Sequence, residues 1–150
     1  MTTVQVSALK IAAVLWVIWG LVHALAGFIV LSGSAAEGVQ AIADAVDPAL
    51  LVGPYPDAAG GILNQHGWNL LWFGIVTGIG GVFIWRANLT AIWVTALIGG
   101  LADLGYFLFL DLAGYVNFFP GTVMTLVSST AIILSGYVWL THRNAARADA

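Results

Sequence analysis

The chain has 150 residues, a length that suits one domain, and it is 61% hydrophobic but only 7% charged. Soluble domains carry about 25% charged residues, so this chain lacks the polar side chains needed to cover a water-facing surface. The four Lys and Arg residues form no basic patch that would suit a nucleic acid, and the absence of Cys excludes disulfide exchange and thiolate chemistry.

Four long, almost uncharged runs follow one another along the chain. A helix needs about 20 apolar residues to cross a bilayer, and each run reaches or nearly reaches that length with its flanks. The first run is longer than the apolar part of a signal peptide, about 7–15 residues, so we interpret it as a span. We therefore expect an all-α membrane protein, a four-transmembrane-helix antiparallel bundle in which residues 1–150 form a single integral membrane domain. The predicted spans are about 8–32, 65–85, 89–110 and 118–141.

The connection between the first two spans, 33–62, is the longest. Ser34 and Glu37 form a capping-box pattern, and apolar residues then recur at helical spacing. This pattern predicts a short amphipathic helix over 35–46 that lies at the membrane interface. The turn-forming residues at 53–61 predict a loop before the second span.

The basic residues all fall on one side of this topology, whereas the long connection carries four acids and no base. The basic residues are Lys10, Arg86, Arg143 and Arg147. Cytoplasmic loops carry the excess of Lys and Arg in membrane proteins. We therefore predict a multi-pass protein of the cell (inner) membrane with both termini in the cytoplasm.

Polar side chains occur inside every span, at similar depths in the outer half of the predicted bundle. By the helix rise of about 1.5 Å per residue, His23 lies about 12 Å and Asp103 about 10 Å below the outer ends of their spans. Thr125 lies at a similar depth, and Asn69 and His66 lie nearer the mouth. Small and polar residues share a helix face with each of them, and such faces turn away from lipid. The sequence predicts a polar pocket in the outer half of the bundle.

Asp103 is the only acid inside a predicted span, and an ionisable group within the membrane is by default a functional hypothesis. Its match in depth with His23 predicts a hydrogen-bonded pair that handles protons, although the same pair could simply lock two helices together. The remaining residues of the predicted site would bind a ligand. They are His66, Asn69, Tyr106, Thr125, Trp16 and Trp72.

Several of these residues also have ordinary structural interpretations. His66 could contact lipid headgroups at a helix start, where Asn64 would be the N-cap. The tryptophans, Trp16 and Trp72 among them, could serve packing and interface anchoring. Gly74 and Gly78 match the spacing of close-packed membrane helices, within the bundle or against another subunit.

The preferred hypothesis is a pocket that binds a small lipophilic molecule, such as an isoprenoid, a quinone or a sterol-like compound, with or without acid–base catalysis. The first alternative is a non-catalytic accessory subunit, or a homo-oligomer, that associates through Gly74 and Gly78. The second is a metal or haem site formed by His23 and His66, although their predicted depths differ. A dimeric transporter is a further alternative. No pattern in the sequence specifies a cofactor.

Overall fold

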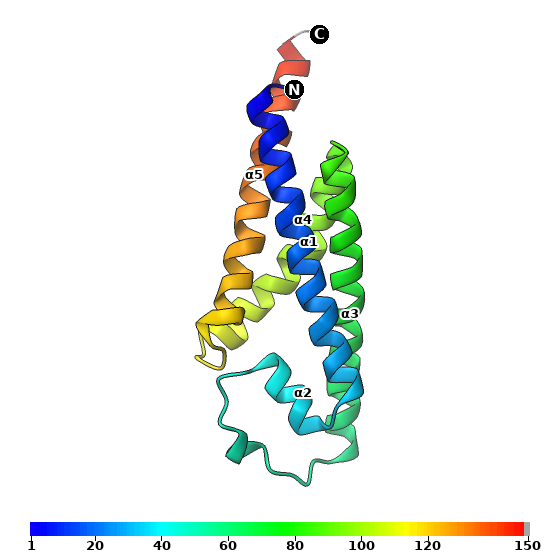
Figure 1. Ribbon diagram of the computed structural model, residues 1–150, viewed down its shortest axis with the longest axis vertical. Helices are drawn as coiled ribbons and strands as arrows, with labels where there is room; N and C mark the ends of the chain where they lie inside the picture. Colours follow the sequence, from blue (N-terminus) through cyan, green and yellow to red (C-terminus); the bar gives the residue numbers. More distant parts are fainter. Residues whose placement is uncertain (149–150) are drawn as a thin grey trace.

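The computed structural model describes residues 1–148, with side chains described as far as His142. Four long helices and one short helix make up the fold, and no strand occurs within 1–148 (Figure 1). The helices are α1 (Thr3–Ser32), α2 (Ala35–Ile42), α3 (Asp57–Trp85), α4 (Leu89–Tyr106) and α5 (Val123–Ala148). Three short turns complete the chain, namely η1 (Pro48–Leu51), η2 (Phe107–Asp111) and η3 (Phe118–Thr122).

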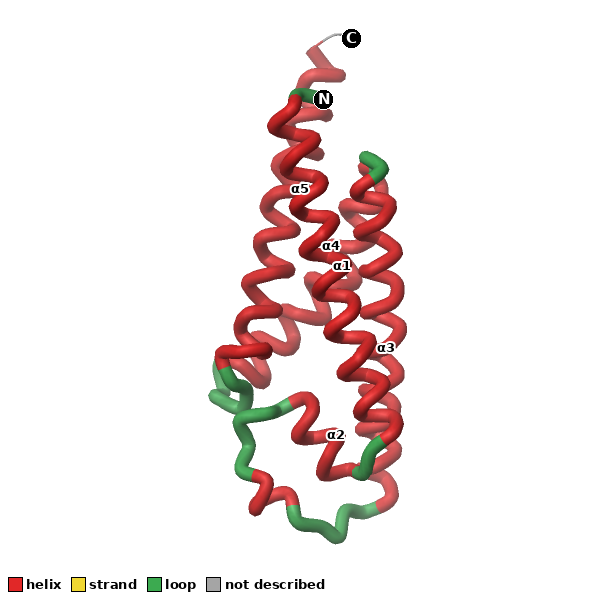
Figure 2. Tube along the Cα trace, in the orientation of Figure 1, coloured by secondary structure: helices red, strands yellow, loops and turns green. Residues whose placement is uncertain are grey.

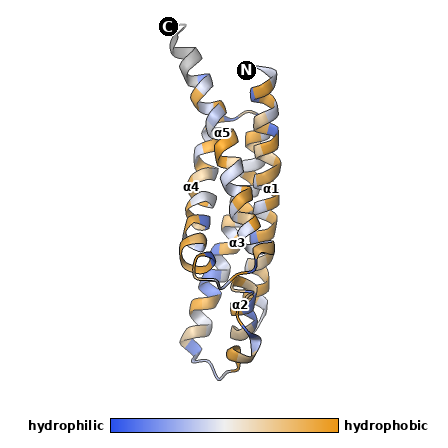
Figure 3. Ribbon diagram, turned by 90° about the vertical axis from the view of Figure 1, so that its left-hand side faces the viewer, coloured by the Kyte–Doolittle hydropathy of each residue, from blue (hydrophilic) through white to orange (hydrophobic). Residues whose placement is uncertain are grey.

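The four long helices are apolar enough, and with their flanking turns long enough, to cross a membrane. Orange, hydrophobic residues cover much of the bundle along its length (Figure 3). The two termini lie at one end, and the long loop with α2 lies at the other end together with the α4–α5 connection (Figure 2). The chain is thus a multi-pass membrane protein, and the predicted four-helix antiparallel bundle with a short helix after the first span is confirmed. Arg143 and Arg147, which helped to orient it, lie outside the described side chains.

Helices α1 and α3 make the closest contact in the bundle, because small residues face each other every seventh position. The facing pairs are Ala13 with Gly81, Gly20 with Gly74, and Gly27 with Gly67. A Cβ built at Gly20 or Gly27 would lie 2.5 Å from the backbone oxygen of the facing glycine, so no side chain fits there. Small residues let membrane helices approach to this distance, and a seven-residue repeat keeps one seam in register.

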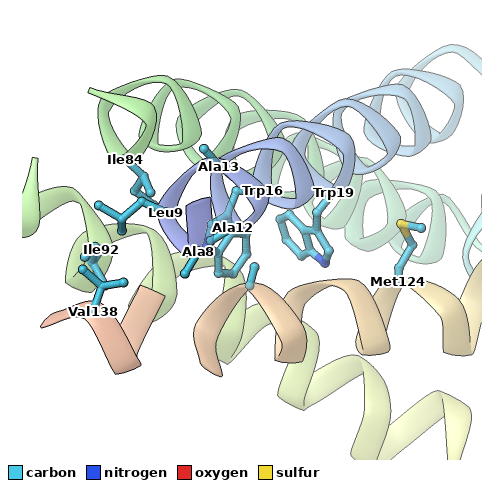
Figure 4. Packing of buried hydrophobic residues seen from close by; sticks show 11 residues of the cluster. Ala8, Leu9, Ala12, Ala13, Trp16, Trp19, Ile84, Ile92, Met124 and Val138 are labelled. Atoms are coloured by element: carbon cyan, nitrogen blue, oxygen red, sulfur yellow. The ribbon is translucent and has the colours of Figure 1, made fainter. Parts of the chain in front are cut away.

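The core lies between this helix pair and the other two helices, and two indoles fill it. Trp16 and Trp19 extend from α1 and are fully buried (Figure 4). Their rings meet edge to face, with centroids 5.8 Å apart. Trp16 also reaches α4, where a Cβ at Gly99 would lie 2.5 Å from its Cζ3. The two tryptophan side chains therefore fill the core space that the glycines of α1 and α3, which have no side chains, leave open.

Polar contacts fasten the end of the bundle that holds the termini. Gln5 Nε2 on α1 donates to Thr141 Oγ1 on α5 at 2.9 Å. The Lys10 ammonium lies 5.2 Å from the ring centroid of Trp85, at the end of α3. An interfacial tryptophan and a lysine at one level are typical of a membrane boundary.

Helix α4 crosses behind α1, from the side of α3 toward the end of the bundle at which α5 begins (Figure 1). It continues through the π-helical turn η2 as far as Asp111, and the chain returns through η3 into α5. The two turns are joined by a hydrogen bond from Thr122 Oγ1 to Asp111 Oδ1 at 3.0 Å. The long loop also contacts this end of the bundle, where Asn117 N donates to Asp44 Oδ1 at 2.8 Å.

Helix α3 begins at Asp57, eight residues before the predicted start of the span at 65. The predicted loop at 53–61 is therefore wrong in its second half. Pro56 precedes the helix and Asp57 places a negative charge in its first turn, where the helix dipole favours it. By the helix rise, His66 lies about 28 Å from Trp85, close to the thickness of the hydrocarbon core. The turns of α3 before His66 are therefore additional to the length that a span requires.

The predicted helix at 35–46 exists, but α2 ends at Ile42. Its capping box is confirmed, since Ser34 N donates to Glu37 Oε2 at 2.7 Å and Glu37 N donates to Ser34 Oγ at 3.4 Å. The helix stops early because the next residues turn toward the α4–α5 connection. Ala45 N donates to the Tyr115 backbone oxygen at 3.0 Å.

Candidate functional site

Two adjoining cavities lie at the α2 end of the bundle, with volumes of about 100 Å³ and about 340 Å³. They share four lining residues, namely His23, His66, Leu70 and Tyr106. We call the combined space the histidine cavity. The smaller part extends to Ala41 and Ile42 of α2, and the larger part extends along α4. The structure thus brings together three of the predicted site residues, one each from α1, α3 and α4.

His23 is oriented by its own helix. Its Nδ1 donates to the backbone oxygen of Trp19 at 2.8 Å, because a carbonyl can only accept. The imidazole also stacks on the Trp19 indole, with centroids 3.6 Å apart and planes inclined by 17°. In the neutral ring the other nitrogen, Nε2, is then a hydrogen-bond acceptor. No described side chain bonds to Nε2, which leaves it for a molecule in the cavity.

His66 and Tyr106 add two further polar groups to the lining. His66 is exposed at the rim of the cavity, and Tyr106 is half-buried. Within the described residues, neither side chain makes a hydrogen bond to the protein. A Cβ at Gly121 would lie 3.0 Å from the Tyr106 hydroxyl. The absence of a side chain at Gly121 therefore makes room for that hydroxyl. Three polar groups thus border an otherwise apolar cavity, and each can still form hydrogen bonds.

We expected His23 and Asp103 to be joined directly or through one water, and the structure shows no direct hydrogen bond between them. Ser128 Oγ on α5 donates a short hydrogen bond to Asp103 Oδ2, and His23 bonds to the Trp19 backbone instead. The Trp19 side chain is close enough to act on the Asp103 carboxyl, while its ring stacks on His23. The fully buried Trp19 indole lies between the two groups.

The other predicted ligand-binding residues lie elsewhere. Thr125 lines a separate cleft between α4 and α5 together with Asp103. Trp16 is enclosed in the core. On α3, Trp72 Nε1 donates to Asn69 Oδ1 at 3.2 Å, so the polar atoms of these two side chains bond to each other. The residues of the single predicted pocket are therefore divided between the histidine cavity and this separate cleft, and a ligand role for these four residues stays a prediction.

The early start of α3 changes two further interpretations. Asn64 does not cap the helix, because Pro56 holds the N-cap position. The difference in depth that argued against joint use of His23 and His66 is smaller than expected, since both line the same cavity. In the described part of the chain, no group of three His, Cys, Asp or Glu residues is placed to hold a metal ion.

Some lining residues were missed from the sequence. Met124 and Gly121 reach the cavity because η3 places them beneath α2, and no local pattern in the sequence predicts that irregular turn. The role of Trp19 had a detectable signal. It precedes His23 by four residues, a spacing that places two side chains on one helix face.

No protein-family model, curated protein or solved structure matches the chain. The function must therefore be inferred from the side chains that line the cavities and from the helices that enclose them.

Proposed function

We propose that this four-span membrane protein binds a small lipophilic molecule with one polar group in the histidine cavity. The observation that carries the proposal is the convergence of His23, His66 and Tyr106, from three different helices, on one apolar cavity. Ligand sites in proteins are mostly apolar with a few placed polar groups, and their volumes start at about 300 Å³. The histidine cavity fits both criteria.

The polar groups favour a ligand that both donates and accepts hydrogen bonds, or one that only accepts them. His23 Nε2 accepts, and the Tyr106 hydroxyl can donate or accept. A hydroxyl at the end of an isoprenoid or sterol-like molecule can bond to both groups, whereas a quinone carbonyl can only accept, from the Tyr106 hydroxyl. If the bound molecule reacts, His23 would take a proton and Tyr106 would supply one. Asp103 would influence His23 only through the Trp19 indole.

Helix α2 forms the roof of the site. Ala41 and Ile42 line the cavity, and two hydrogen bonds between Asp44 and Asn117 tie the end of α2 to the α4–α5 connection. The roof would direct a lipophilic ligand to enter from the bilayer side, between α3 and α4. We also propose that this end faces outward and that both termini are cytoplasmic, on the distribution of Lys and Arg.

Metal or haem binding by His23 and His66 is a second candidate, favoured by one observation. His23 donates its Nδ1 hydrogen to a backbone carbonyl, as metal-ligating histidines do, and presents Nε2 to a cavity that it shares with His66. Two nitrogen ligands would hold the metal here. The accessory-subunit hypothesis has no comparable support, because Gly74 packs within the bundle against Gly20.

The test compares what co-purifies with three forms of the protein in mild detergent. These are the unmodified chain, His66→Leu, and His142→Leu as a control at the opposite end of the bundle. Mass spectrometry of the extract should show one defined lipophile in near-equal molar amount with the unmodified chain and the control, and much less with His66→Leu.

The same samples distinguish the alternatives. An intense visible absorption band, or a metal found by elemental analysis, that disappears in His66→Leu would replace the lipophile by haem or metal. The same mixture of bilayer lipids from all three forms would refute a specific site in the histidine cavity.

A further inference from the structure

Asp103 occupies an unusual setting that the histidine cavity does not explain. It is only 2% exposed, and its Oδ2 accepts from Ser128. Its Oδ1 and the Nε1 of the adjacent Trp19 are both buried, and neither makes a hydrogen bond within the described residues. The nearby Thr125 Oγ1 is also buried without a partner. A buried carboxylate oxygen that lacks a partner is costly. An unmatched buried acceptor of this kind requires an explanation, and a donor supplied by a ligand is one.

Both residues line a cleft of about 670 Å³ between α4 and α5, which we call the acidic cleft. Ser128 and Ser129 add hydroxyl groups, and the rest of the lining is apolar, with exposed leucines such as Leu97 and Leu101 at its edge. Within the described residues, no Lys, Arg or His lines the acidic cleft. The protein itself therefore supplies no positive charge to the carboxylate.

We propose that the acidic cleft is a second, membrane-facing binding site, and that it takes a lipophilic amine in its protonated form. The ammonium would donate to Asp103 Oδ1 and to Thr125 Oγ1, and the apolar chain would lie along α4 toward Trp93. An ammonium is the group that satisfies an acceptor and neutralises a charge at once. This proposal does not depend on what the histidine cavity binds.

The depth of Asp103 narrows the class of amine. By the helix rise, Asp103 lies about 12 Å below Asp111 at the end of the span. A phospholipid amine would have to bring its phosphate to the same depth, where a second charge would have no partner. A simple amine on a chain or ring carries only the charge that Asp103 can balance. We therefore exclude phospholipid headgroups as ligands of the acidic cleft and expect amphiphiles whose only charge is on the amine.

The binding test uses Trp93 as the reporter. Trp93 lines the acidic cleft, and by the helix rise it lies about 15 Å from Asp103 along α4. The protein in lipid nanodiscs is titrated with ω-bromoundecylamine and, separately, with ω-bromoundecanol, whose length is the same. Bromine quenches a nearby indole, and Trp93→Phe identifies the part of the signal that comes from the acidic cleft.

The amine should quench Trp93 saturably and bind about tenfold or more tightly than the alcohol, because a hydrogen bond to a charged group is worth more than a neutral one. Asp103→Asn should remove that preference. Asp111→Asn, a matched acid at the end of the same span, should keep it. Thr125→Val should weaken the amine only a few-fold.

Equal binding of amine and alcohol by the unmodified chain would overturn the proposal, because a neutral Asp103 or a simple lipid groove would then explain the cleft. So would an amine preference that persists in Asp103→Asn. The comparison of the two probes on the unmodified chain needs no variant, so it remains decisive even if Asp103→Asn fails to fold.

Discussion

Two alanine substitutions one turn apart on α3 should have opposite effects on stability. In Gly74→Ala, the new Cβ would lie 2.5 Å from the Gly20 backbone oxygen and closer still to the backbone nitrogen of Ala24. In Gly78→Ala, the new Cβ would have no atom within 4 Å. The atoms that crowd position 74 are backbone, so they can move only if the two helices separate.

The magnitude follows from two terms. Alanine is favoured over glycine inside a helix by about 0.5–1 kcal/mol, and this gain applies to both variants. Overpacking a close contact costs about 1–3 kcal/mol, and this cost applies only to Gly74→Ala. The difference between the two variants therefore isolates the clash. We expect Gly78→Ala to be neutral or stabilised and Gly74→Ala to be less stable than Gly78→Ala by about 1–3 kcal/mol.

Reversible unfolding by SDS in mixed micelles, followed by circular dichroism, measures both values. Gly20→Ala should behave like Gly74→Ala, because its Cβ would lie 2.5 Å from the Gly74 backbone oxygen. Equal effects of Gly74→Ala and Gly78→Ala would show that α1 and α3 do not pack in this register. Loss of an oligomer on Gly78→Ala would instead move position 78 to an intersubunit contact.

Three further predictions concern the end of the bundle that holds α2. A periplasmic reporter should be active when fused at Ser34 and inactive at the C-terminus, and the reverse would refute the proposed orientation. The backbone and side-chain hydrogen bonds from Ser34 hold the pKa of Glu37 below its usual value. The contribution of the cap to stability is therefore fully present above the usual pKa of Glu and is lost as the pH falls through the lowered pKa of Glu37. The protection of the α2 amides against hydrogen exchange, taken relative to their intrinsic exchange rates at each pH, should therefore fall on acidification, and this fall should be absent in Glu37→Ala. Asp44→Ala removes the carboxylate that accepts from Asn117 N and leaves the backbone oxygen that accepts from Asn117 Nδ2, so it should lower the protection of α2 at neutral pH, whereas unchanged protection would show that this side-chain link does not hold the roof.

The sequence predicts the membrane class, the four spans and their antiparallel order because these depend on the length and charge of apolar runs. It also predicts that His23, His66 and Tyr106 face inward, because a polar side chain in lipid has no partner. The start of α3 could not be predicted, since Gly60 and Gly61 are typical of turns and yet lie in its open first turns. That error placed His66 at a helix terminus rather than within a helix.

The direct hydrogen bond between His23 and Asp103 is absent for a different reason. Depth along a helix axis is readable from residue number, but the direction around the bundle depends on how the helices cross. The side chain of Trp19 separates the two groups, and α4 crosses toward α5, so Asp103 meets Ser128 instead. The polar residues of the one predicted pocket therefore line two separate spaces, the histidine cavity and the acidic cleft.

The most direct test of the histidine cavity asks where a lipophilic probe binds. An alkyl diazirine that carries a terminal hydroxyl is photolysed with the protein in nanodiscs, and the labelled residues are mapped by mass spectrometry. Labelling should concentrate on cavity residues such as Leu70 and Met124. It should fall about fivefold in Tyr106→Phe, as the loss of one hydrogen bond implies, and stay unchanged in the control Tyr137→Phe. Labels spread over the outward-facing leucines, equally in both variants, would contradict a binding site in the histidine cavity.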